Sequence, residues 1–190
     1  VGSEMCIRDR INIVNDLDTI SKLESNMNQL KMERFDIVAL AREIAEQAEM
    51  EADRKGIRIS VKGAENLPSP FWVLADKHYI GQVFVNLIIN SVRYGKEGGM
   101  TRVHFRDMLD KILVEVEDNG SGIGKEDLPR VFEKGFTGCN GRTDKRATGI
   151  GLYLCRRILE KLGHTIAITS TVGEGTTVRI GLQQDALEVE

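Results

Sequence analysis

The sequence predicts an α+β fold, a two-layer α/β sandwich in which helices cover one face of a mixed, mostly antiparallel sheet. Segments with helical periodicity alternate with segments rich in β-branched residues, which indicates both kinds of element within one domain. The strand segments of the second half follow each other in pairs across short turns, whereas a doubly wound parallel sheet places a helix between successive strands. We therefore expect antiparallel pairs rather than repeated βαβ units.

The composition is that of an ordinary globular domain. The chain has 190 residues, of which 41% are hydrophobic and 29% charged, and its net charge is -3. Both signs of charge are spread along the chain, so there is no basic footprint for nucleic acid, and no apolar run approaches the roughly 18 residues of a membrane span. Cys6, Cys139 and Cys155 lack metal-ligand spacing and indicate reduced thiols. We expect a cytoplasmic domain that contacts neither nucleic acid nor membrane.

The N-terminal part divides in two. We interpret residues 1–10 as a leader foreign to the domain and exclude them from fold reasoning. From Ile11 to Glu24, apolar residues recur at helical spacing opposite a polar face, which predicts one amphipathic helix. An amphipathic helix without a partner is normally half of a hairpin or a dimer bundle. The predicted divisions of the chain are a leader at 1–10, a helical extension at 11–34, the main domain at 35–184 and a tail at 185–190.

The next elements begin with acidic caps. Asp36 is placed to cap a helix whose apolar stripe ends before Gly56, a typical stop. Alternating residues predict strands at 57–61 and 71–74, on either side of a proline-containing loop at 67–70. Asp76 is placed to cap a second long helix, which runs to Tyr94.

The second half is predicted as two strand pairs around a glycine-rich stretch. The expected elements are strands 102–106 and 111–117 with a turn at 107–110, a mostly loop region at 120–149 with a short helix at 126–132, a helix at 150–162, and a hairpin of strands 165–170 and 176–182. Of the 19 glycines, 11 lie between Gly95 and Gly151. Because glycine is costly in regular structure, this cluster indicates loops that need positive φ or a close backbone approach to a ligand.

The helix 76–94 carries an unusual polar face. Gln82, Asn86, Asn90 and Arg93 recur at spacings that place them together, away from the apolar stripe. Surface helix faces usually favour Lys and Glu, and side-chain amide oxygens are hard, neutral ligands suited to Mg²⁺. Taken alone, the same pattern is also typical of a solvated helix face.

A carboxylate followed by alternate glycines comes directly after the strand 111–117. In this segment, 118–124, Asp118 is positioned to accept a hydrogen bond from an amine, and the glycines allow backbone N–H groups to turn toward an anion. The segment is not a P-loop, because Glu126 follows Gly124-Lys125 and position 119 is Asn. It is not a dinucleotide fingerprint, because its third glycine comes one residue too early. A glycine-rich surface turn remains the alternative.

A second glycine segment, 148–152, opens the helix 150–162. Unpaired N–H groups and the positive end of the helix dipole make such a start a phosphate site. Arg142, Lys145 and Arg146 precede it in a loop that is able to fold over a triphosphate; a solvated basic loop is the alternative.

The polar helix face and the two glycine segments occur in a fixed order. Phe132–Thr137 lies between the two glycine segments, and Gly173–Thr177 follows them. In this order they resemble the ATPase superfamily shared by gyrase, Hsp90, histidine kinases and MutL, and within it the catalytic and ATP-binding domain of sensor histidine kinases. Residues 82–94 match the N box, and the later segments match the glycine and F boxes. The resemblance covers residues 35 to about 182 and implies the Bergerat-type ATP-binding fold.

The resemblance also implies roles in binding ATP and Mg²⁺. Asn90 would ligate Mg²⁺ with Asn86 beside the same ion, Arg93 would contact phosphate, Tyr94 would lie against the adenine, and Asp118 would accept from the adenine amino group. The glycines that would shape the pocket or receive phosphates are Gly120, Gly122, Gly124, Gly149 and Gly151. The other residues assigned to nucleotide contact are Ile123, Phe132, Arg142, Lys145, Arg146, Thr148, Ile150, Leu152 and Thr176, with a lid expected at 138–148.

The sequence departs from the superfamily in two informative ways. Position 86 is Asn where hydrolysing members carry a Glu that activates water, so transfer to a protein histidine fits better than hydrolysis. His78, His104 and His164 lack the context of a phosphoacceptor, so we expect no acceptor histidine in this chain. The helix 11–24 instead resembles the end of a dimerisation and phosphotransfer hairpin.

The resemblance therefore implies a two-component kinase whose partners are its own dimerisation hairpin, in a homodimeric parent, and a response regulator. The parent is expected to be anchored in the bacterial inner membrane. Two alternatives remain, both from the same superfamily: a conformational module that hydrolyses ATP, and an anti-sigma-type regulator that phosphorylates serine. Asn86 speaks against the first, and the helix 11–24 speaks against the second.

Overall fold

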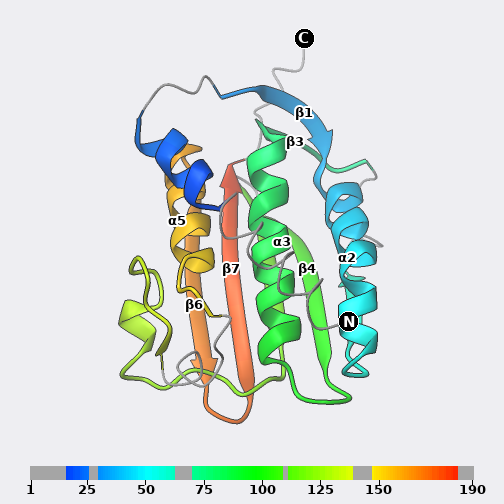
Figure 1. Ribbon diagram of the computed structural model, residues 1–190. Helices are drawn as coiled ribbons and strands as arrows, with labels where there is room; N and C mark the ends of the chain where they lie inside the picture. Colours follow the sequence, from blue (N-terminus) through cyan, green and yellow to red (C-terminus); the bar gives the residue numbers. More distant parts are fainter. Residues whose placement is uncertain (1–15, 26–29, 63–69, 109–110, 139–146, 184–190) are drawn as a thin grey trace.

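The structure is a computed structural model that describes residues 16–25, 30–62, 70–108, 111–138 and 147–183. It has two layers, a sheet and a set of helices that cover one of its faces, as predicted (Figure 1). A helical segment at residues 16–24 comes first. The elements that follow are β1 (Met32–Asp36), α2 (Ile37–Asp53), β2 (Arg58–Lys62), β3 (Trp72–Asp76), α3 (Lys77–Tyr94), β4 (Met100–Met108), β5 (Lys111–Asp118), the 3₁₀ turn η1 (Leu128–Arg130), α5 (Gly151–Lys161), β6 (Thr165–Thr171) and β7 (Gly175–Gln183).

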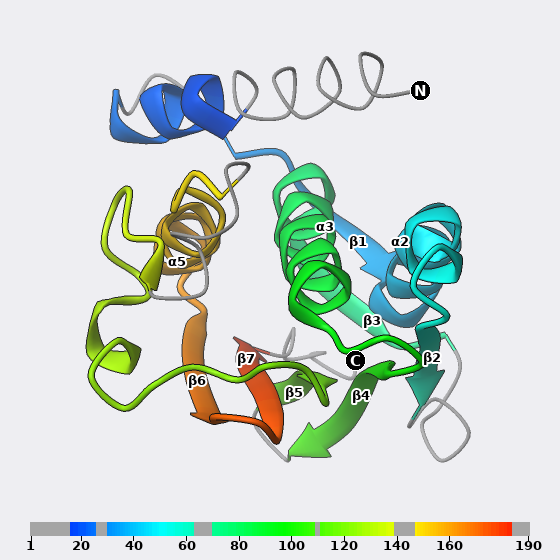
Figure 2. The ribbon, with the colours of Figure 1, turned by 60° about the horizontal axis from the view of Figure 1, so that its bottom comes forward.

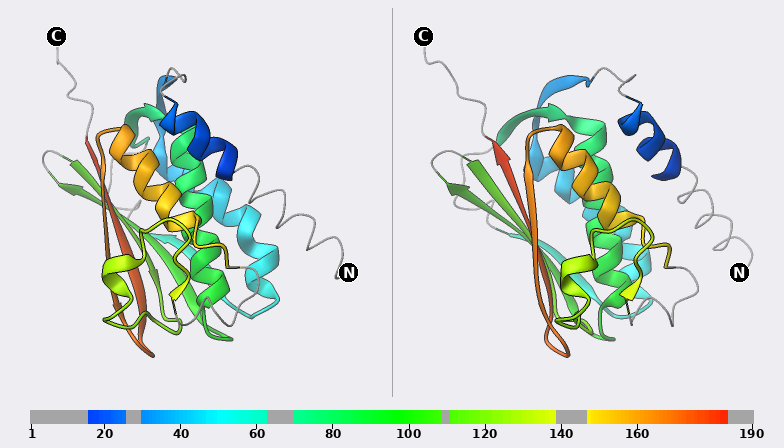
Figure 3. Two further views of the ribbon diagram at one scale, coloured as in Figure 1. Left: turned by 60° about the vertical axis from the view of Figure 1, so that its left-hand side comes forward. Right: turned by 90° about the vertical axis from the view of Figure 1, so that its left-hand side faces the viewer.

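The main sheet has five strands in the order β2-β4-β5-β7-β6. β2 runs parallel to β4, and the other neighbours are antiparallel, which confirms the mixed, mostly antiparallel sheet. Seen along the sheet, α2, α3 and α5 all lie on the same side (Figure 3). None of the described helices is long and apolar enough to cross a membrane.

Aspartates begin the two long helices, as predicted. Asp36 accepts hydrogen bonds from the backbone N–H groups of Val38 and Ala39, and Asp76 accepts one from Tyr79. These side chains satisfy amides that have no partner within their helices, and an N-cap of this kind stabilises a helix by about 1 kcal/mol. Both aspartates also end a strand, so each change from strand to helix occurs at a single residue.

A second, two-stranded sheet was not predicted. It consists of β1 and β3, which pair antiparallel. A strand was predicted at the position of β3, whereas no strand was predicted before the helix that Asp36 caps. The backbone N–H of Lys31 donates to Asp76 at 2.9 Å, which ties the start of β1 to the cap of α3. Phe35 and Val73 face the core, whereas Trp72 is 47% exposed.

The core lies between the main sheet and the helices. α3 and α5 contribute Phe84, Ile88, Leu154 and Ile158, all of them almost fully buried. Phe84 meets Phe105 of β4 edge to face, with ring centroids 6.4 Å apart. Because α3 is buried on one side, its other side is available for the cleft described below.

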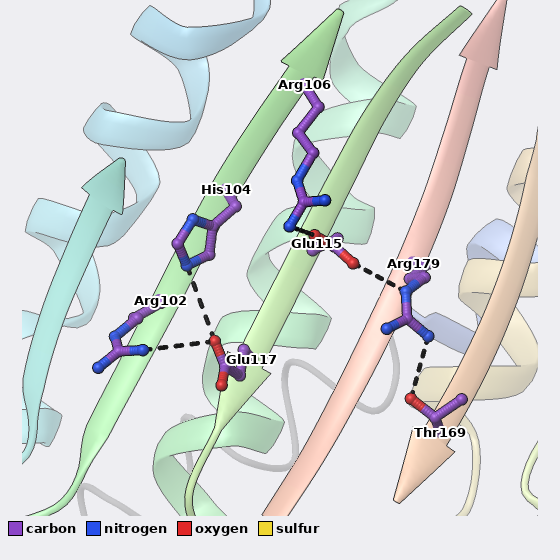
Figure 4. A network of polar contacts seen from close by, with 7 residues as sticks. All are labelled: Arg102, His104, Arg106, Glu115, Glu117, Thr169 and Arg179. Carbon is purple, nitrogen blue, oxygen red and sulfur yellow. Dashed lines mark hydrogen bonds and ion pairs between the residues drawn. The ribbon is translucent and has the colours of Figure 1, made fainter. Parts of the chain in front are cut away.

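The outer face of the main sheet carries a polar network (Figure 4). Glu115 of β5 is held between Arg106 of β4, at 3.1 Å, and Arg179 of β7, at 2.8 Å. Glu117 lies 3.7 Å from both Arg102 and His104. These cross-strand pairs stabilise the pairing register on the face that has no helices.

Several predicted boundaries were wrong. β2 begins one residue late because Ile57 still donates to the carbonyl of Ala52 at the end of α2. The predicted turn at 107–110 is strand up to Met108, since β4 and β5 stay paired to that point. The helix predicted at 126–132 is only the 3₁₀ turn η1, which contains a proline near its start. Proline has no backbone N–H to donate, so it does not support a longer helix at this point. Some predictions lie wholly or partly outside the described residues. These are the leader and the start of the first helix (1–15), part of the proline-containing loop (67–69), part of the turn (109–110) and the tail (184–190).

Candidate functional site

A cleft of about 1250 Å³ lies between α3, the loop after β5 and the start of α5. Each of these walls comes from a different part of the chain, and Figure 2 shows how the three elements are arranged. The predicted residues that line the cleft are Asn86, Asn90, Arg93, Tyr94, Asp118, Gly122, Ile123, Gly124, Thr148, Gly149, Gly151, Leu152 and Thr176. The two glycine segments and the N-box helix are therefore brought together around one space.

The amide side chains of α3 form one wall. The Nδ2 group of Asn86 donates to the carbonyl of Gln82 at 3.1 Å, one turn earlier. The first residue of α5 faces this wall: a Cβ atom on Gly151 would lie 2.9 Å from Oδ1 of Asn86 and 3.7 Å from Nδ2 of Asn90. The positive N-terminal end of a helix and two neutral amides thus face each other across a short gap.

The opposite end of the cleft contains a half-buried carboxylate. Asp118, the last residue of β5, accepts a hydrogen bond from the backbone N–H of Gly120 at 2.8 Å. Burial raises the pKa of Asp118, while backbone hydrogen bonds from Gly120 and Thr176 act in the opposite direction. An acceptor that is partly removed from water and held by the backbone suits a ligand group that carries N–H donors.

The loop after Asp118 is packed so tightly that it requires glycine. Gly122 has a φ of 69°, and a Cβ atom there would overlap the carbonyl oxygen of Thr171. A Cβ atom on Gly120 would overlap the carbonyl oxygen of Tyr94, and the N–H of Ser121 donates to that oxygen at 3.1 Å. The loop is therefore clamped between the end of α3 and the β6–β7 hairpin.

The start of α5 has the features of an anion site. Gly149 has a φ of 66°, and its carbonyl accepts from the N–H of Gly135 at 3.0 Å. The N-cap position is Ile150, whose side chain has no acceptor, so it cannot satisfy the amides of the first turn. They belong to the end of α5 that lies beside Asn86 and Asn90, where phosphate oxygens would be suitable partners.

Some predicted site residues lie elsewhere. Gly120, Ile150 and Phe132 do not line the cleft. Phe132 lies beside Arg156, whose guanidinium is 5.8 Å from the centre of its ring. Val131 and Phe136, its neighbours along the chain, do line the cleft. Arg142, Lys145 and Arg146, with most of the predicted lid, lie outside the described residues.

Sequence reasoning missed Asp16 as a residue of this cleft. Its Oδ1 accepts from Nε2 of Gln82 at 3.2 Å, and it is also hydrogen-bonded to Asn86. Burial raises the pKa of Asp16, and these two hydrogen bonds partly offset the effect. The amphipathic pattern had placed Asp16 on a polar helix face, but nothing in the sequence indicated that this face meets α3.

The helical segment that carries Asp16 packs against both helices of the cleft. Ile20 and Leu23 are buried, and Thr19 accepts from Gln82 Nε2 at 3.3 Å. At its far end, the hydroxyl of Tyr153 on α5 donates to Glu24 at 3.2 Å. The segment therefore bridges α3 and α5 (Figure 1), and its residues Asp16, Asp18 and Thr19 line the cleft.

The donor set fits a magnesium ion better than a transition metal. In the described part of the chain, no three His, Cys, Asp or Glu side chains are grouped to hold a metal. The amides of Asn86 and Asn90 lie beside the start of α5, and Oε1 of Gln82 is buried without a hydrogen-bond partner among the described residues. Mg²⁺ keeps several waters and takes few protein ligands, so a site built from amides and substrate phosphates suits it.

Comparison with known proteins agrees with this geometry. Residues 75–186 match the family model described as histidine kinase-, DNA gyrase B- and HSP90-like ATPase. The chain is 31% identical to sensor protein kinase GraS of Staphylococcus aureus, over 94% of this chain and 51% of that protein. It is 31% identical to the aerobic respiration control sensor protein ArcB of Escherichia coli, over 94% of this chain and 23% of that protein. The chain thus spans about half or less of the length of these relatives.

Solved structures show the same fold. The catalytic domain of histidine kinase ThkA superposes with a TM-score of 0.68 at 25% identity, over 81% of this chain and 96% of that domain. Full-length ShkA, solved in complex with AMPPNP, superposes with a TM-score of 0.78 at 25% identity, over 94% of this chain and 37% of that protein.

Proposed function

The chain belongs to the histidine kinase-, DNA gyrase B- and HSP90-like ATPase family, and we propose that it is the ATP-binding catalytic domain of a two-component sensor histidine kinase. In this proposal it transfers the γ-phosphoryl group of ATP to a histidine on a dimerisation hairpin. Its sensor kinase relatives and the AMPPNP complex of ShkA support the assignment.

One observation carries the proposal: a single cleft joins a half-buried acceptor, Asp118, to a helix start, Gly151, that faces the amides of Asn86 and Asn90. The two ends match the two ends of ATP. Asp118 accepts from the adenine amino group, and the backbone around Gly122 encloses the base. The N–H groups of α5 receive phosphate oxygens, which places the terminal phosphate at the open side of the cleft.

We also propose a magnesium site in the same cleft. Asn90 and Asn86 hold the ion through their amide oxygens, together with phosphate oxygens and water. When bound, Mg²⁺ supplies charge neutralisation for the phosphates. The residues of the chain contribute the rest: they hold the triphosphate, exclude water from the base end and leave the γ-phosphate exposed to an incoming nucleophile.

Transfer is favoured over hydrolysis by the residue at position 86. An asparagine amide does not accept a proton from water, whereas a histidine acceptor brings its own nucleophilic nitrogen. His104 lies on the outer face of the sheet, His164 is buried after α5, and His78, which lines the cleft at the start of α3, lacks the sequence context of a phosphoacceptor. The acceptor is therefore assigned to a hairpin, of which residues 11–34 are the end and residues 35–184 the attached catalytic domain.

The partners follow from this assignment. We propose a homodimeric parent that is anchored in the bacterial inner membrane, and a response regulator that receives the phosphoryl group. The structure of ThkA in complex with response regulator TrrA, at 23% identity to this chain, is the precedent for the last step.

The test is phosphotransfer in trans. The purified chain is incubated with γ-labelled ATP and a dimerisation hairpin taken from a related sensor kinase, alongside a hairpin whose acceptor histidine is replaced by glutamine. We expect label only on the histidine-containing hairpin, and we expect acid to remove it. Steady phosphate release without any hairpin would instead identify a hydrolysing module, and acid-stable label on serine would identify an anti-sigma-type kinase.

A further inference from the structure

One hydroxyl group, on Ser170 of β6, connects three parts of the base end of the cleft. Ser170 Oγ accepts from the backbone N–H of Ile123 at 2.8 Å, donates to the carbonyl of Gly175 at 2.7 Å and lies 2.9 Å from Oγ1 of Thr176. Ile123 and Thr176 line the cleft, whereas Ser170 lies behind them. Ser170 can therefore affect a ligand only through these neighbours.

The number of protons fixes the direction of each hydrogen bond. A serine hydroxyl has one proton and two lone pairs. The Gly175 carbonyl can only accept and the Ile123 N–H can only donate, so the proton of Ser170 is used by Gly175. The hydroxyl of Thr176 must then donate to Ser170, so both lone pairs of Thr176 Oγ1 are left to accept hydrogen bonds.

Asp118 lies next to this oxygen. Thr176 is its direct partner in the pairing of β5 with β7, and both residues line the cleft. Because the hydroxyl proton of Thr176 is donated to Ser170, Asp118 and Thr176 offer two adjacent acceptor oxygens to the cleft. Neither side chain offers a hydroxyl proton there. Such an arrangement favours an amino group on the base and disfavours a carbonyl oxygen at the same position.

We propose that Ser170 is a positioning residue that selects a 6-amino purine over a 6-oxo purine. It does so by orienting the hydroxyl of Thr176 and by fixing the amide of Ile123. This inference rests on the proposed function, because it assigns the base specificity of the same cleft.

The test compares affinities for ATP and inosine triphosphate, measured by calorimetric titration; the second nucleotide has an oxygen in place of the 6-amino group and a proton on N1. Wild type, Ser170→Ala, Ser170→Thr and Thr169→Ala are compared. Thr169 is a matched control, because it is the adjacent residue of β6 and its side chain lies on the outer face, where it accepts from Arg179 at 3.1 Å (Figure 4). Melting temperatures show whether each variant is folded.

We expect Ser170→Ala to lose about tenfold in ATP affinity and to lose much of the preference for ATP over inosine triphosphate. Ser170→Thr keeps the hydroxyl and should retain the preference, as should Thr169→Ala. If Ser170→Ala does not fold, Ser170→Cys, which has a weak donor and acceptor of similar shape, takes its place.

An unchanged preference in a folded Ser170→Ala protein, or an equal loss in Thr169→Ala, would overturn the role of Ser170 while leaving the proposed function intact. A wild-type protein that binds neither nucleotide would overturn the proposed function, and this inference with it.

Discussion

A Cβ atom on Gly151 would lie 2.9 Å from Oδ1 of Asn86, so the first residue of α5 and the N-box helix approach as closely as glycine permits. The two residues are 65 positions apart in the chain, and their approach creates the narrow end of the cleft. Any side chain at position 151 would enter the space assigned to the phosphates.

Gly151→Ala is therefore expected to weaken nucleotide binding without unfolding the protein. The added methyl group meets the end of a flexible side chain, Asn86, which is able to shift. Alanine is also favoured over glycine within a helix by about 0.5–1 kcal/mol. Titration with a non-hydrolysable ATP analogue should show a loss of about tenfold or more, with an equal or higher melting temperature. Wild-type affinity would show that this gap does not hold phosphate.

Asp118→Asn is expected to weaken binding of the base. The Asn Oδ1 atom would keep the hydrogen bond from Gly120, so the NH₂ group would face the cleft and oppose an amino group. A hydrogen bond to a charged group contributes about 1.5–3 kcal/mol, which corresponds to an affinity loss of about 10- to 100-fold. Glu117→Gln is the control, because Glu117 faces Arg102 and His104 on the outer side of the sheet. Equal affinities for the two variants would contradict the role of Asp118.

Gly122→Ala is expected to destabilise the fold. Its φ of 69° is strained for a residue with a side chain, and the added Cβ would overlap the Thr171 carbonyl oxygen. Together these effects should lower the free energy of unfolding by about 2 kcal/mol or more, measured by urea denaturation. Gly124→Ala is the matched control in the same loop, because a Cβ atom there would meet nothing within 4 Å. Similar stabilities for the two variants would mean that the loop is not clamped as described.

Acid is expected to destabilise the protein through His164. This side chain is buried, its Nδ1 accepts from the N–H of Gln183 at 3.4 Å, and burial lowers its pKa below the ordinary value of 6.5. Below about pH 6.5 the unfolded chain binds a proton that the folded protein binds only at lower pH, so stability falls as the pH falls through this window. The free energy of unfolding of His164→Gln should depend less on pH than that of wild type between pH 7 and 5. The control is His104→Gln, on the outer face of the sheet, and equal pH slopes for wild type and His164→Gln would contradict the prediction.

The sequence predicted best where the signal is local. The aspartate caps at Asp36 and Asp76 act within three residues of their own position, so the residue type and the start of the apolar stripe were sufficient. The hairpin of β6 and β7 was predicted for the same reason, because its turn glycines lie between its two strands. The short strand β1 was missed because its partner, β3, is separated from it by the whole of α2.

The candidate site shows the same difference between local signals, which the sequence contains, and long-range contacts, which it does not. The boxes that line the cleft were identified from their residue types and order, but the sequence does not state which parts of the chain touch. The contact of Asp16 with Gln82 joins residues 66 positions apart, and the contact of Ser170 with Ile123 joins residues 47 positions apart. Such contacts depend on how helices and hairpins pack, and packing is not encoded by any short segment.

Binding of Mg²⁺ and nucleotide tests the central claim most directly. The purified chain and its Asn90→Ala variant are titrated with a non-hydrolysable ATP analogue, each with Mg²⁺ and with EDTA. The account predicts that wild type binds more tightly with Mg²⁺ and that Asn90→Ala loses this gain while it keeps the metal-independent affinity, since Asp118 and the base end are unchanged. Absence of binding by a folded wild-type protein would contradict an ATP site in this cleft, and an equal Mg²⁺ effect in both proteins would contradict Asn90 as the ligand of the ion.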